Sequence, residues 1–205
     1  MKKILSKVRT TAIAAVLSLA AAGANAAEGD RLLRFGVANV NPSAGSTGVV
    51  PDDAIDVDDG TAAFINGTYM IRDNVGLELL ASTPFNHDII LKGTGKIAET
   101  DQLPPTLSLQ YHFAPQSKVR PYVGAGINWT IFFNEKATDV INSISLDDSV
   151  GWAIQIGADA DINEKWFLNA DIRKMDISTT AKTDLGNVDV TIDPVVVSLG
   201  VGFRF

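Results

Sequence analysis

Eight segments of the chain place bulky apolar residues at every second position and small or polar residues between them. Alternation with period 2 is typical of a β-strand, whose successive side chains point to opposite faces. Segments with a helical period are absent. In residues 106–113 the pattern has no exception, with Leu107, Leu109, Tyr111 and Phe113 on one face. The eight segments are residues 31–41, 61–71, 74–85, 106–113, 122–133, 149–161, 166–177 and 195–205.

The composition of the second face decides what kind of all-β fold to expect. A soluble sandwich packs its bulky apolar face inside and exposes long charged side chains. Here the second face carries mostly Gly, Ala, Ser, Thr, Asn and Gln. Small residues suit the crowded interior of a narrow barrel, and the bulky apolar face suits lipid. We therefore predict an eight-stranded antiparallel transmembrane β-barrel.

The connections between the segments alternate in length. Long connections cover residues 42–60, 86–105, 134–148 and 178–194, and the intervening ones are shorter, at 72–73, 114–121 and 162–165. This alternation is typical of outer-membrane barrels with long extracellular loops and short periplasmic turns. An even number of strands then places both ends of the barrel in the periplasm.

The first 26 residues have the organisation of a secretory signal peptide. Basic residues precede an apolar stretch over 12–22, and Ala24-Asn25-Ala26 fits a signal peptidase site. The apolar stretch would rise only about 16 Å as a helix, whereas the hydrocarbon core is about 30 Å thick. We expect residues 1–26 to be removed, leaving 27–205 as a single barrel domain without a transmembrane helix.

Composition excludes several classes of function. The formal charge is −7, and it becomes −11 once the leader takes four cationic residues and no acidic ones, so nucleic acid is not an expected partner. With no cysteine and only His87 and His112, the chain offers little for metal or triad chemistry, and we expect no cofactor and no enzyme activity. Five aspartates in residues 52–59 lack the calcium-loop spacing, which favours a solvated acidic loop.

Aromatic residues collect at strand ends, as in the interfacial belts of membrane proteins. We assign one belt beside the short turns to Tyr69, Tyr111, Phe113, Tyr122, Trp166, Phe203 and Phe205. We assign a second belt, at the opposite ends, to Phe35, Phe85, Phe132, Phe133 and Trp152.

Several motifs resemble the OmpW family of small outer-membrane proteins. They are the residues 77–85 (LELLASTPF), 103–106 (LPPT), 120–128 (RPYVGAGIN), 175–177 (MDI) and 203–205 (FRF). The resemblance covers the whole mature chain and implies an eight-stranded barrel proposed to admit small hydrophobic molecules. It also implies that Phe205 belongs to the signal read by the barrel-assembly machinery. Arg173 stands where family members often carry an aromatic, so a purely apolar constriction is not implied.

The inward face divides into two zones by height. A charged zone holds six residues that we expect to form a buried ion-pair network closing the water route: Arg34, Glu78, Asp159, Asp171, Arg173 and Arg204. Above it lies a largely uncharged cup for cargo, in which we single out Phe64, Leu80, Ser82, Asn128 and Met175. Simple packing of the barrel interior is the alternative for most of these side chains.

The wall of the barrel offers a second feature. Pro84 ends one segment, and Pro104-Pro105 precede the next, so two neighbouring strands lose backbone donors at one height. This predicts a lateral gap, although the prolines could equally serve only to set the loop path.

Two functions follow from these expectations. The first is passive uptake of small hydrophobic molecules through the outer membrane of a Gram-negative bacterium, with outer-membrane lipid and lipopolysaccharide as surroundings. The alternative is a non-transporting envelope or receptor protein that acts through its extracellular loops. Uptake depends on the cup and the wall, whereas a receptor depends on residues 42–60, 86–102 and 134–148.

Overall fold

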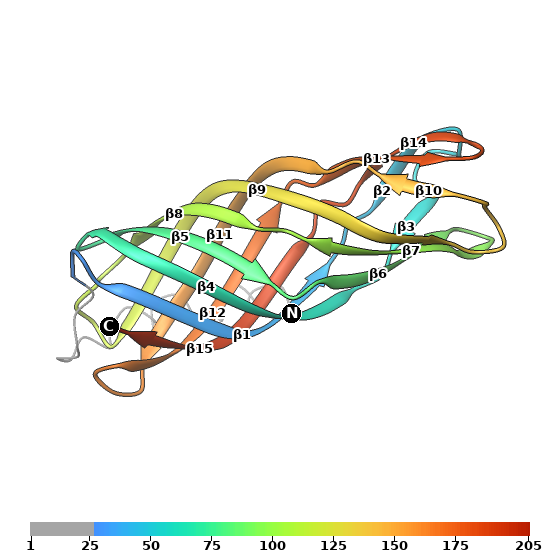
Figure 1. Ribbon diagram of the computed structural model, residues 1–205. Coiled ribbons are helices and arrows are strands. Elements are labelled where there is room, and N and C mark those ends of the chain that lie inside the picture. The colour runs from blue at the N-terminus through green and yellow to red at the C-terminus, as the bar shows by residue number, and fades with distance from the viewer. Residues whose placement is uncertain (1–26) are drawn as a thin grey trace, which may run out of the picture.

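Eight strands pair edge to edge around a closed antiparallel barrel in the computed structural model, which describes residues 27–205 (Figure 1). The predicted leader, residues 1–26, lies outside the described residues. The barrel strands are β1 (Arg31–Asn41), β4 (Gly60–Arg72), β5 (Val75–Ser82), β8 (Thr106–His112), β9 (Val119–Ala137), β11 (Ser149–Asp161), β12 (Trp166–Met175) and β15 (Val195–Arg204). Closure comes from β15 pairing with β1, where Leu32 faces Arg204 and Asn41 faces Val195. Within residues 27–205, no helix has the length and apolar character needed to cross a bilayer.

The predicted long loops are largely strands, and this is the main difference from the sequence analysis. They form an extension of the barrel on one side (Figure 1). Its strands are β2 (Gly45–Gly48), β3 (Ile55–Val57), β6 (Phe85–Leu91), β7 (Gly95–Leu103), β10 (Ile144–Leu146), β13 (Ser178–Thr183) and β14 (Gly186–Thr191). β6 pairs with β7, and β7 pairs with the end of β9, so the wall of the barrel continues into the extension.

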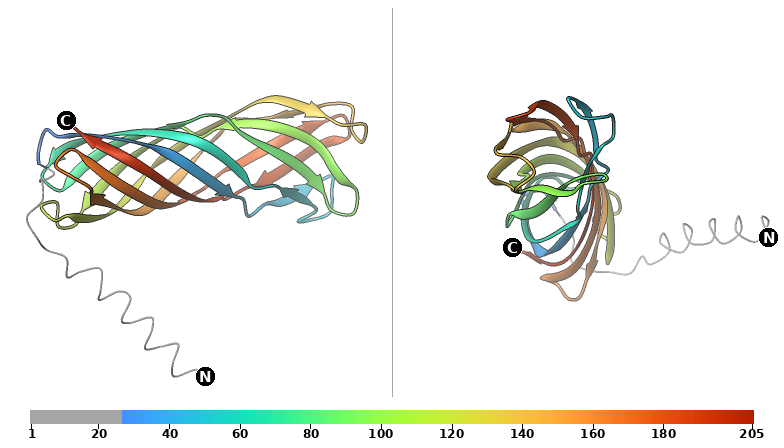
Figure 2. Two further views of the ribbon diagram at one scale, coloured as in Figure 1. Left: turned by 90° about the horizontal axis from the view of Figure 1, so that it is seen from below. Right: turned by 90° about the vertical axis from the view of Figure 1, so that its right-hand side faces the viewer.

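The opposite end, which we call the turn end, carries the short connections and both ends of the described chain (Figure 2). Arg31 and Phe205 exchange two backbone hydrogen bonds there, each 3.1 Å long. Short turns and chain ends belong on the periplasmic side of such barrels, so the extension lies on the extracellular side.

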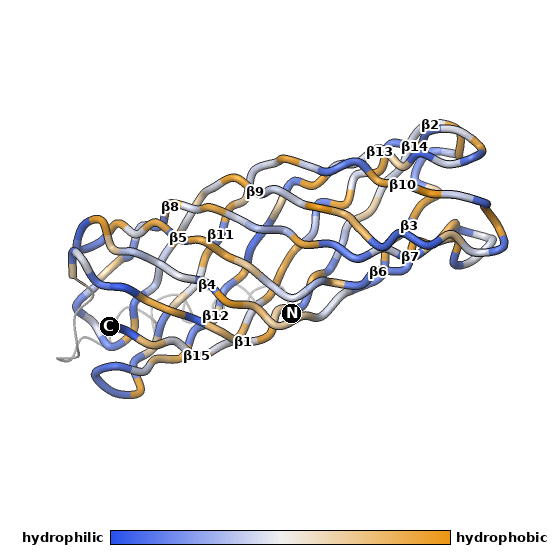
Figure 3. Tube along the Cα trace, in the orientation of Figure 1, coloured by the Kyte–Doolittle hydropathy of each residue, from blue (hydrophilic) through white to orange (hydrophobic). Residues whose placement is uncertain are grey.

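Hydrophilic and hydrophobic residues follow one another along the barrel strands (Figure 3). Burial alternates along β4 and β8 in the same way, which separates a lipid face from a lumen face. In β4 the even-numbered residues from Ala62 to Met70 are buried, and the odd-numbered ones are exposed. The first and sixth predicted segments coincide with β1 and β11. β9 runs further than predicted at both ends, and β5 stops at Ser82, before Pro84.

Aromatic side chains form one belt at the turn end. The rings of Trp166 and Phe203 lie 5.0 Å apart, and those of Tyr111 and Phe113 lie 5.1 Å apart. Phe35 belongs to this belt, since its ring is 6.4 Å from Trp166, so its assignment to the opposite belt was wrong.

Three further aromatic assignments were wrong because the rings point into the barrel. Tyr122 is only 1% exposed and lies in the lumen, where Gly157 opposite it leaves room; a Cβ on Gly157 would lie 2.4 Å from the Tyr122 hydroxyl. Tyr122 and the inward Gly124 lie two positions apart in β9, so they face the same side of the wall. Phe85 and Phe132 are buried inside the extension, where they pack against other apolar side chains.

Candidate functional site in the barrel lumen

Arg34 anchors the polar zone of the lumen. Its guanidinium donates two hydrogen bonds to Asp159 across the barrel, from Nε to Oδ1 at 3.0 Å and from Nη2 to Oδ2 at 2.8 Å. Nη1 donates to the Thr68 hydroxyl at 2.7 Å, and the group lies 5.3 Å from the centre of the Tyr122 ring. Both charged side chains are fully buried. A bidentate geometry of this kind is the strongest form of an arginine–carboxylate pair.

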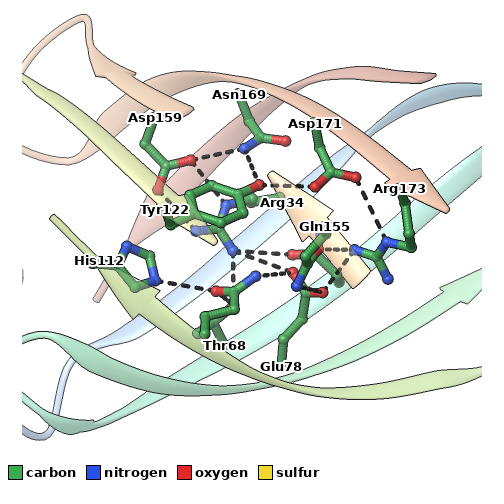
Figure 4. A network of polar contacts seen from close by, with 12 residues as sticks. Arg34, Thr68, Glu78, His112, Tyr122, Gln155, Asp159, Asn169, Asp171 and Arg173 are labelled. Carbon is green, nitrogen blue, oxygen red and sulfur yellow. Dashed lines mark hydrogen bonds and ion pairs between the residues drawn. The ribbon is translucent and has the colours of Figure 1, made fainter. Parts of the chain in front are cut away.

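Glu78 bridges two arginines in the same zone (Figure 4). Its Oε1 lies 2.8 Å from Nη2 of Arg173, and its Oε2 lies 3.7 Å from Nη1 of Arg34. Gln110 and Gln155 donate amide hydrogen bonds to the same carboxylate, at 2.7 Å and 3.2 Å. Four donors therefore compensate the buried carboxylate for lost water.

A chain of contacts completes a circuit across the lumen. Arg173 lies 3.6 Å from Asp171, whose Oδ2 accepts a hydrogen bond of 3.4 Å from the Tyr122 hydroxyl. Asn169 donates to the Tyr122 oxygen at 3.0 Å and to Asp159 at 2.9 Å. We call this set the lumen network, and its members are Arg34, Thr68, Glu78, Gln110, Tyr122, Gln155, Asp159, Asn169, Asp171 and Arg173.

Arg204 lies at the turn-end side of the lumen network. Arg204 lies 3.4 Å from Asp161, and Arg120 lies 2.6 Å from the same carboxylate, at the turn end. Sequence reasoning missed Arg120, because the segment was begun at Tyr122 and Pro121 was read as part of a turn. It also missed Gln110, Gln155 and Asn169 as network members, although their parity had placed them on the inward face.

A small cavity lies directly above the lumen network, with a volume of about 20 Å³. Phe64, Leu80, Ser82 and Met175, four of the five residues assigned to the cup, line this lower cavity. Arg173 also lines it, so the lower cavity reaches the charged zone. Asn128 does not line it, since its amide donates to the Thr106 hydroxyl at 3.0 Å within the wall.

A larger cavity of about 170 Å³ fills the extension. Its lining is mostly aliphatic, with Ile55, Ile89 and Val190 as examples. The polar lining residues are His87, Thr100, Gln102, Thr179 and Thr183. We call it the upper cavity. Gln102 lines both cavities and therefore lies between them. Sequence reasoning missed the upper cavity because its walls were read as loops, although the alternation of Phe85, His87 and Ile89 carried the signal.

The ladder of strand pairing is interrupted at one seam beside the lower cavity. The pairing of β5 with β8 ends at Leu80 and Thr106, and the pairing of β6 with β7 begins at Phe85 and Gln102. Pro84, Pro104 and Pro105 lie in the interval between these two ladders, and Pro104 lines the lower cavity. Both sides stay attached to their other neighbours, with Thr83 N donating to Ala63 O at 2.8 Å and Trp129 N to Pro105 O at 2.9 Å.

The remaining candidate residues lie at the ends of the molecule. Phe205 continues the last strand by its backbone bonds to Arg31, and its ring, 61% exposed, stacks on Phe203 at 5.9 Å. His112 lies in the lumen against Tyr122, whereas His87 lies in the extension. In the part of the chain that the structure describes, no group of three or more His, Asp or Glu side chains could hold a metal ion.

The closed eight-stranded wall, its apolar outer face and its belt of aromatics define a small outer-membrane β-barrel protein of a Gram-negative bacterium. Comparison with known proteins narrows this class. The OmpW family model matches residues 27–205, and outer membrane protein W of Escherichia coli K12 is 42% identical over the full length of both chains. The chain belongs to the OmpW family.

Two further relatives extend the comparison. The crystal structure of the outer membrane protein OprG from Pseudomonas aeruginosa superimposes with a TM-score of 0.81 and 37% identity, covering 89% of this chain and 98% of OprG. A protein of Pseudomonas aeruginosa, the dibenzothiophene metabolism operon protein PahQ, is 31% identical over 76% of this chain and 77% of its own length.

Proposed function

We propose that this barrel admits small apolar molecules passively through the outer membrane. The upper cavity carries the proposal, because a volume of about 170 Å³ with a mostly aliphatic lining suits an apolar solute of one-ring size. An engineered apolar cavity of about 150 Å³ is large enough to bind benzene. The name of PahQ associates one relative with the metabolism of an aromatic compound, which is in keeping with such cargo.

The route we propose runs inward and then sideways. Gln102 joins the two cavities, and the lumen network beneath them acts as a floor, since a solute passing it would have to separate buried ion pairs such as Arg34–Asp159. The seam at Pro84 and Pro104 offers the alternative exit. A neutral apolar solute loses little by leaving through the wall into hydrocarbon.

A receptor acting through its extracellular loops is the competing function. The extension argues for uptake, because its apolar side chains, such as Ile89, Val188 and Val190, are buried around the cavity instead of being offered to a partner. Tyrosine and tryptophan, which dominate protein-binding hot spots, are missing from residues 42–60, 86–102 and 134–148.

A reversible cross-link tests the lateral exit. The chain has no cysteine, so Pro84→Cys with Leu103→Cys places the sole thiols across the seam, next to the paired Phe85 and Gln102. Leu79→Cys with Leu107→Cys is the matched control, since these two residues are paired lower in the same wall, on β5 and β8.

Uptake of a panel of hydrophobic solutes is then compared between deletion cells and cells complemented with each variant. We expect complementation to restore uptake, the seam cross-link to abolish most of it until a reductant is added, and the control cross-link to have little effect. Unchanged uptake in deletion cells would refute transport. Full uptake through the cross-linked seam, together with increased uptake after Glu78→Ala, would show a simple through-pore.

A further inference from the structure

His87 is one of the few polar side chains that line the mostly aliphatic upper cavity, beside Thr100, Gln102, Thr179 and Thr183. It projects inward from β6, is only 2% exposed and lines the upper cavity. The ring stacks on Phe85 with centroids 6.3 Å apart. Gly60 leaves space for it, because a Cβ at that position would lie 2.6 Å from Cε1 of the imidazole. Close packing on both sides therefore fixes the position of the ring.

The contacts of the ring define which nitrogen carries the proton. Nδ1 lies 2.7 Å from the backbone carbonyl oxygen of Asp58, and a carbonyl can only accept a hydrogen bond. Nδ1 must therefore be the protonated nitrogen. Burial lowers the pKa of His87 and keeps the ring neutral, and this effect outweighs the opposite influence of Asp58, Asp59 and Asp101. In the neutral ring Nε2 then carries a lone pair and can only accept.

This acceptor has no protein donor. Nε2 of His87 is buried without a hydrogen-bond partner among the described residues. Thr100, another polar residue of the lining, turns its hydroxyl to the backbone oxygens of Asp101 and Phe133, at 3.2 Å and 3.4 Å. Aliphatic walls accommodate water poorly. A buried acceptor in such a low-dielectric site is therefore best satisfied by a mostly apolar ligand that carries a hydrogen-bond donor.

We infer that the upper cavity selects small apolar molecules that carry one hydrogen-bond donor, a hydroxyl or N–H group, and that Nε2 of His87 accepts this hydrogen bond. The inference deepens the proposed function and rests on it, because it specifies the chemical class of the cargo. The specificity is one of functional group: an aromatic alcohol is held more tightly than a hydrocarbon or an ether of the same size. His87 would thus be a specificity-determining residue of the extension.

Three probes of nearly equal size separate the donor from the ring. Phenol carries a donor, anisole carries an oxygen without a donor, and toluene carries neither. Each is titrated into the full barrel in lipid nanodiscs with ¹⁵N-labelled histidine. The chain has two histidines, so His112, in the lumen at the turn end, serves as the internal reference. We expect phenol to shift the Nε2 resonance of His87 while leaving His112 unchanged, and anisole and toluene to leave Nε2 largely unaffected.

Affinities give the second measurement. One neutral hydrogen bond corresponds to a preference for phenol over toluene of roughly three- to tenfold. His87→Phe keeps an aromatic ring beside Phe85 and should reduce this preference to about one, without weakening toluene. The shift of Nε2 in the unaltered protein needs no variant, so the inference is tested even if His87→Phe fails to fold.

The outcomes distinguish the inference from the function on which it rests. Equal binding of all three probes, or a preference for phenol that survives in His87→Phe, would overturn the role of His87 and leave apolar uptake standing. An Nε2 resonance already shifted by bound water and insensitive to phenol would overturn it as well. If none of the probes binds, the cavity is not a solute site, and both proposals fail.

Discussion

Removing either member of the buried Glu78–Arg173 pair should destabilise the barrel strongly, and removing both members should cost no more than removing one. The two side chains are buried, with their charged atoms 2.8 Å apart. Glu78→Gln removes the charge and leaves Arg173 with Asp171 at 3.6 Å as its remaining carboxylate. Arg173→Met leaves Glu78 with Arg34 at 3.7 Å. An uncompensated buried charge costs about 3–5 kcal/mol, so each single substitution should lower the free energy of unfolding by that amount.

The stability losses of the two single substitutions should not add in the double variant. Independent effects would add to about 6–10 kcal/mol, the sum of two losses of about 3–5 kcal/mol each. With both charges gone, Arg34 keeps its bidentate partner Asp159, whereas Asp171 loses Arg173 and keeps the hydrogen bond from the Tyr122 hydroxyl. The double variant and Arg173→Met therefore share the cost at Asp171. We therefore expect the double variant to lose no more than one single variant, which corresponds to a coupling energy on the order of 3 kcal/mol.

Reversible unfolding in urea, followed in phosphatidylcholine vesicles by the mobility shift between folded and unfolded barrels, measures all four proteins of the cycle. Arg72→Met with Glu28→Gln is a matched control, because this ion pair of 3.2 Å is exposed at the turn end and should couple by less than about 1 kcal/mol. A coupling near zero for Glu78 and Arg173 would refute the reasoning, since it would mean that water reaches the lumen network and screens the pair.

Further changes test the register, the packing, assembly and the chemistry of the extension. Ile127 is 63% exposed on the outer face, so Ile127→Arg should cost about 2–4 kcal/mol in bilayers if the side chain meets the middle of the membrane, and unchanged stability would contradict the outward register. Gly36→Ala would bring a Cβ to 2.1 Å from a backbone oxygen of β15, and overpacking of this kind costs about 1–3 kcal/mol; Gly67→Ala, with nothing within 4 Å, should be nearly neutral in the same urea assay. Deletion of Phe205 should lower the amount of barrel in the outer membrane, and normal levels would show that assembly does not need it. Acidification should loosen the extension, because burial lowers the pKa of His87: below the ordinary histidine value of about 6.5 the unfolded ring takes up a proton that the folded ring resists, so stability is lost as pH falls. Protease digestion at pH 7.5 and 5 should show this loss in the unaltered protein and less of it in His87→Phe.

The barrel strands could be predicted because their two faces lie in two different environments. Lipid outside and a narrow lumen inside impose opposite demands on neighbouring residues, and β1 and β11 accordingly end where the alternation ends. The extension lies beyond the membrane and has water outside, so its outward residues are polar and often charged, like those of loops. Its inward residues, such as Ile89 and Val190, still alternate, and this weaker pattern was insufficient to separate strand from loop.

The lumen network could be predicted only in part. Alternation gives the face on which a residue lies, but the stagger of the strands around the barrel decides which residues meet across it. Arg34 and Asp159 are 125 positions apart and no local pattern joins them. The same stagger places Arg204 with Asp161, at the turn-end side of the network.

The position of the lumen network bears on its purpose. Apolar residues of similar volume can replace a buried ion pair without loss of stability, so stability alone does not explain why Arg34, Glu78 and Arg173 lie in the barrel. Their height in the lumen does suggest an explanation, because Arg173 lies at the base of the lower cavity. An apolar plug there would continue the aliphatic lining downward and offer a solute no boundary. A charged zone of matched pairs presents an apolar molecule with groups that it cannot solvate, while the adjacent seam leads to hydrocarbon. In the proposed route, the network therefore sets the direction of movement, from the cavities toward the wall.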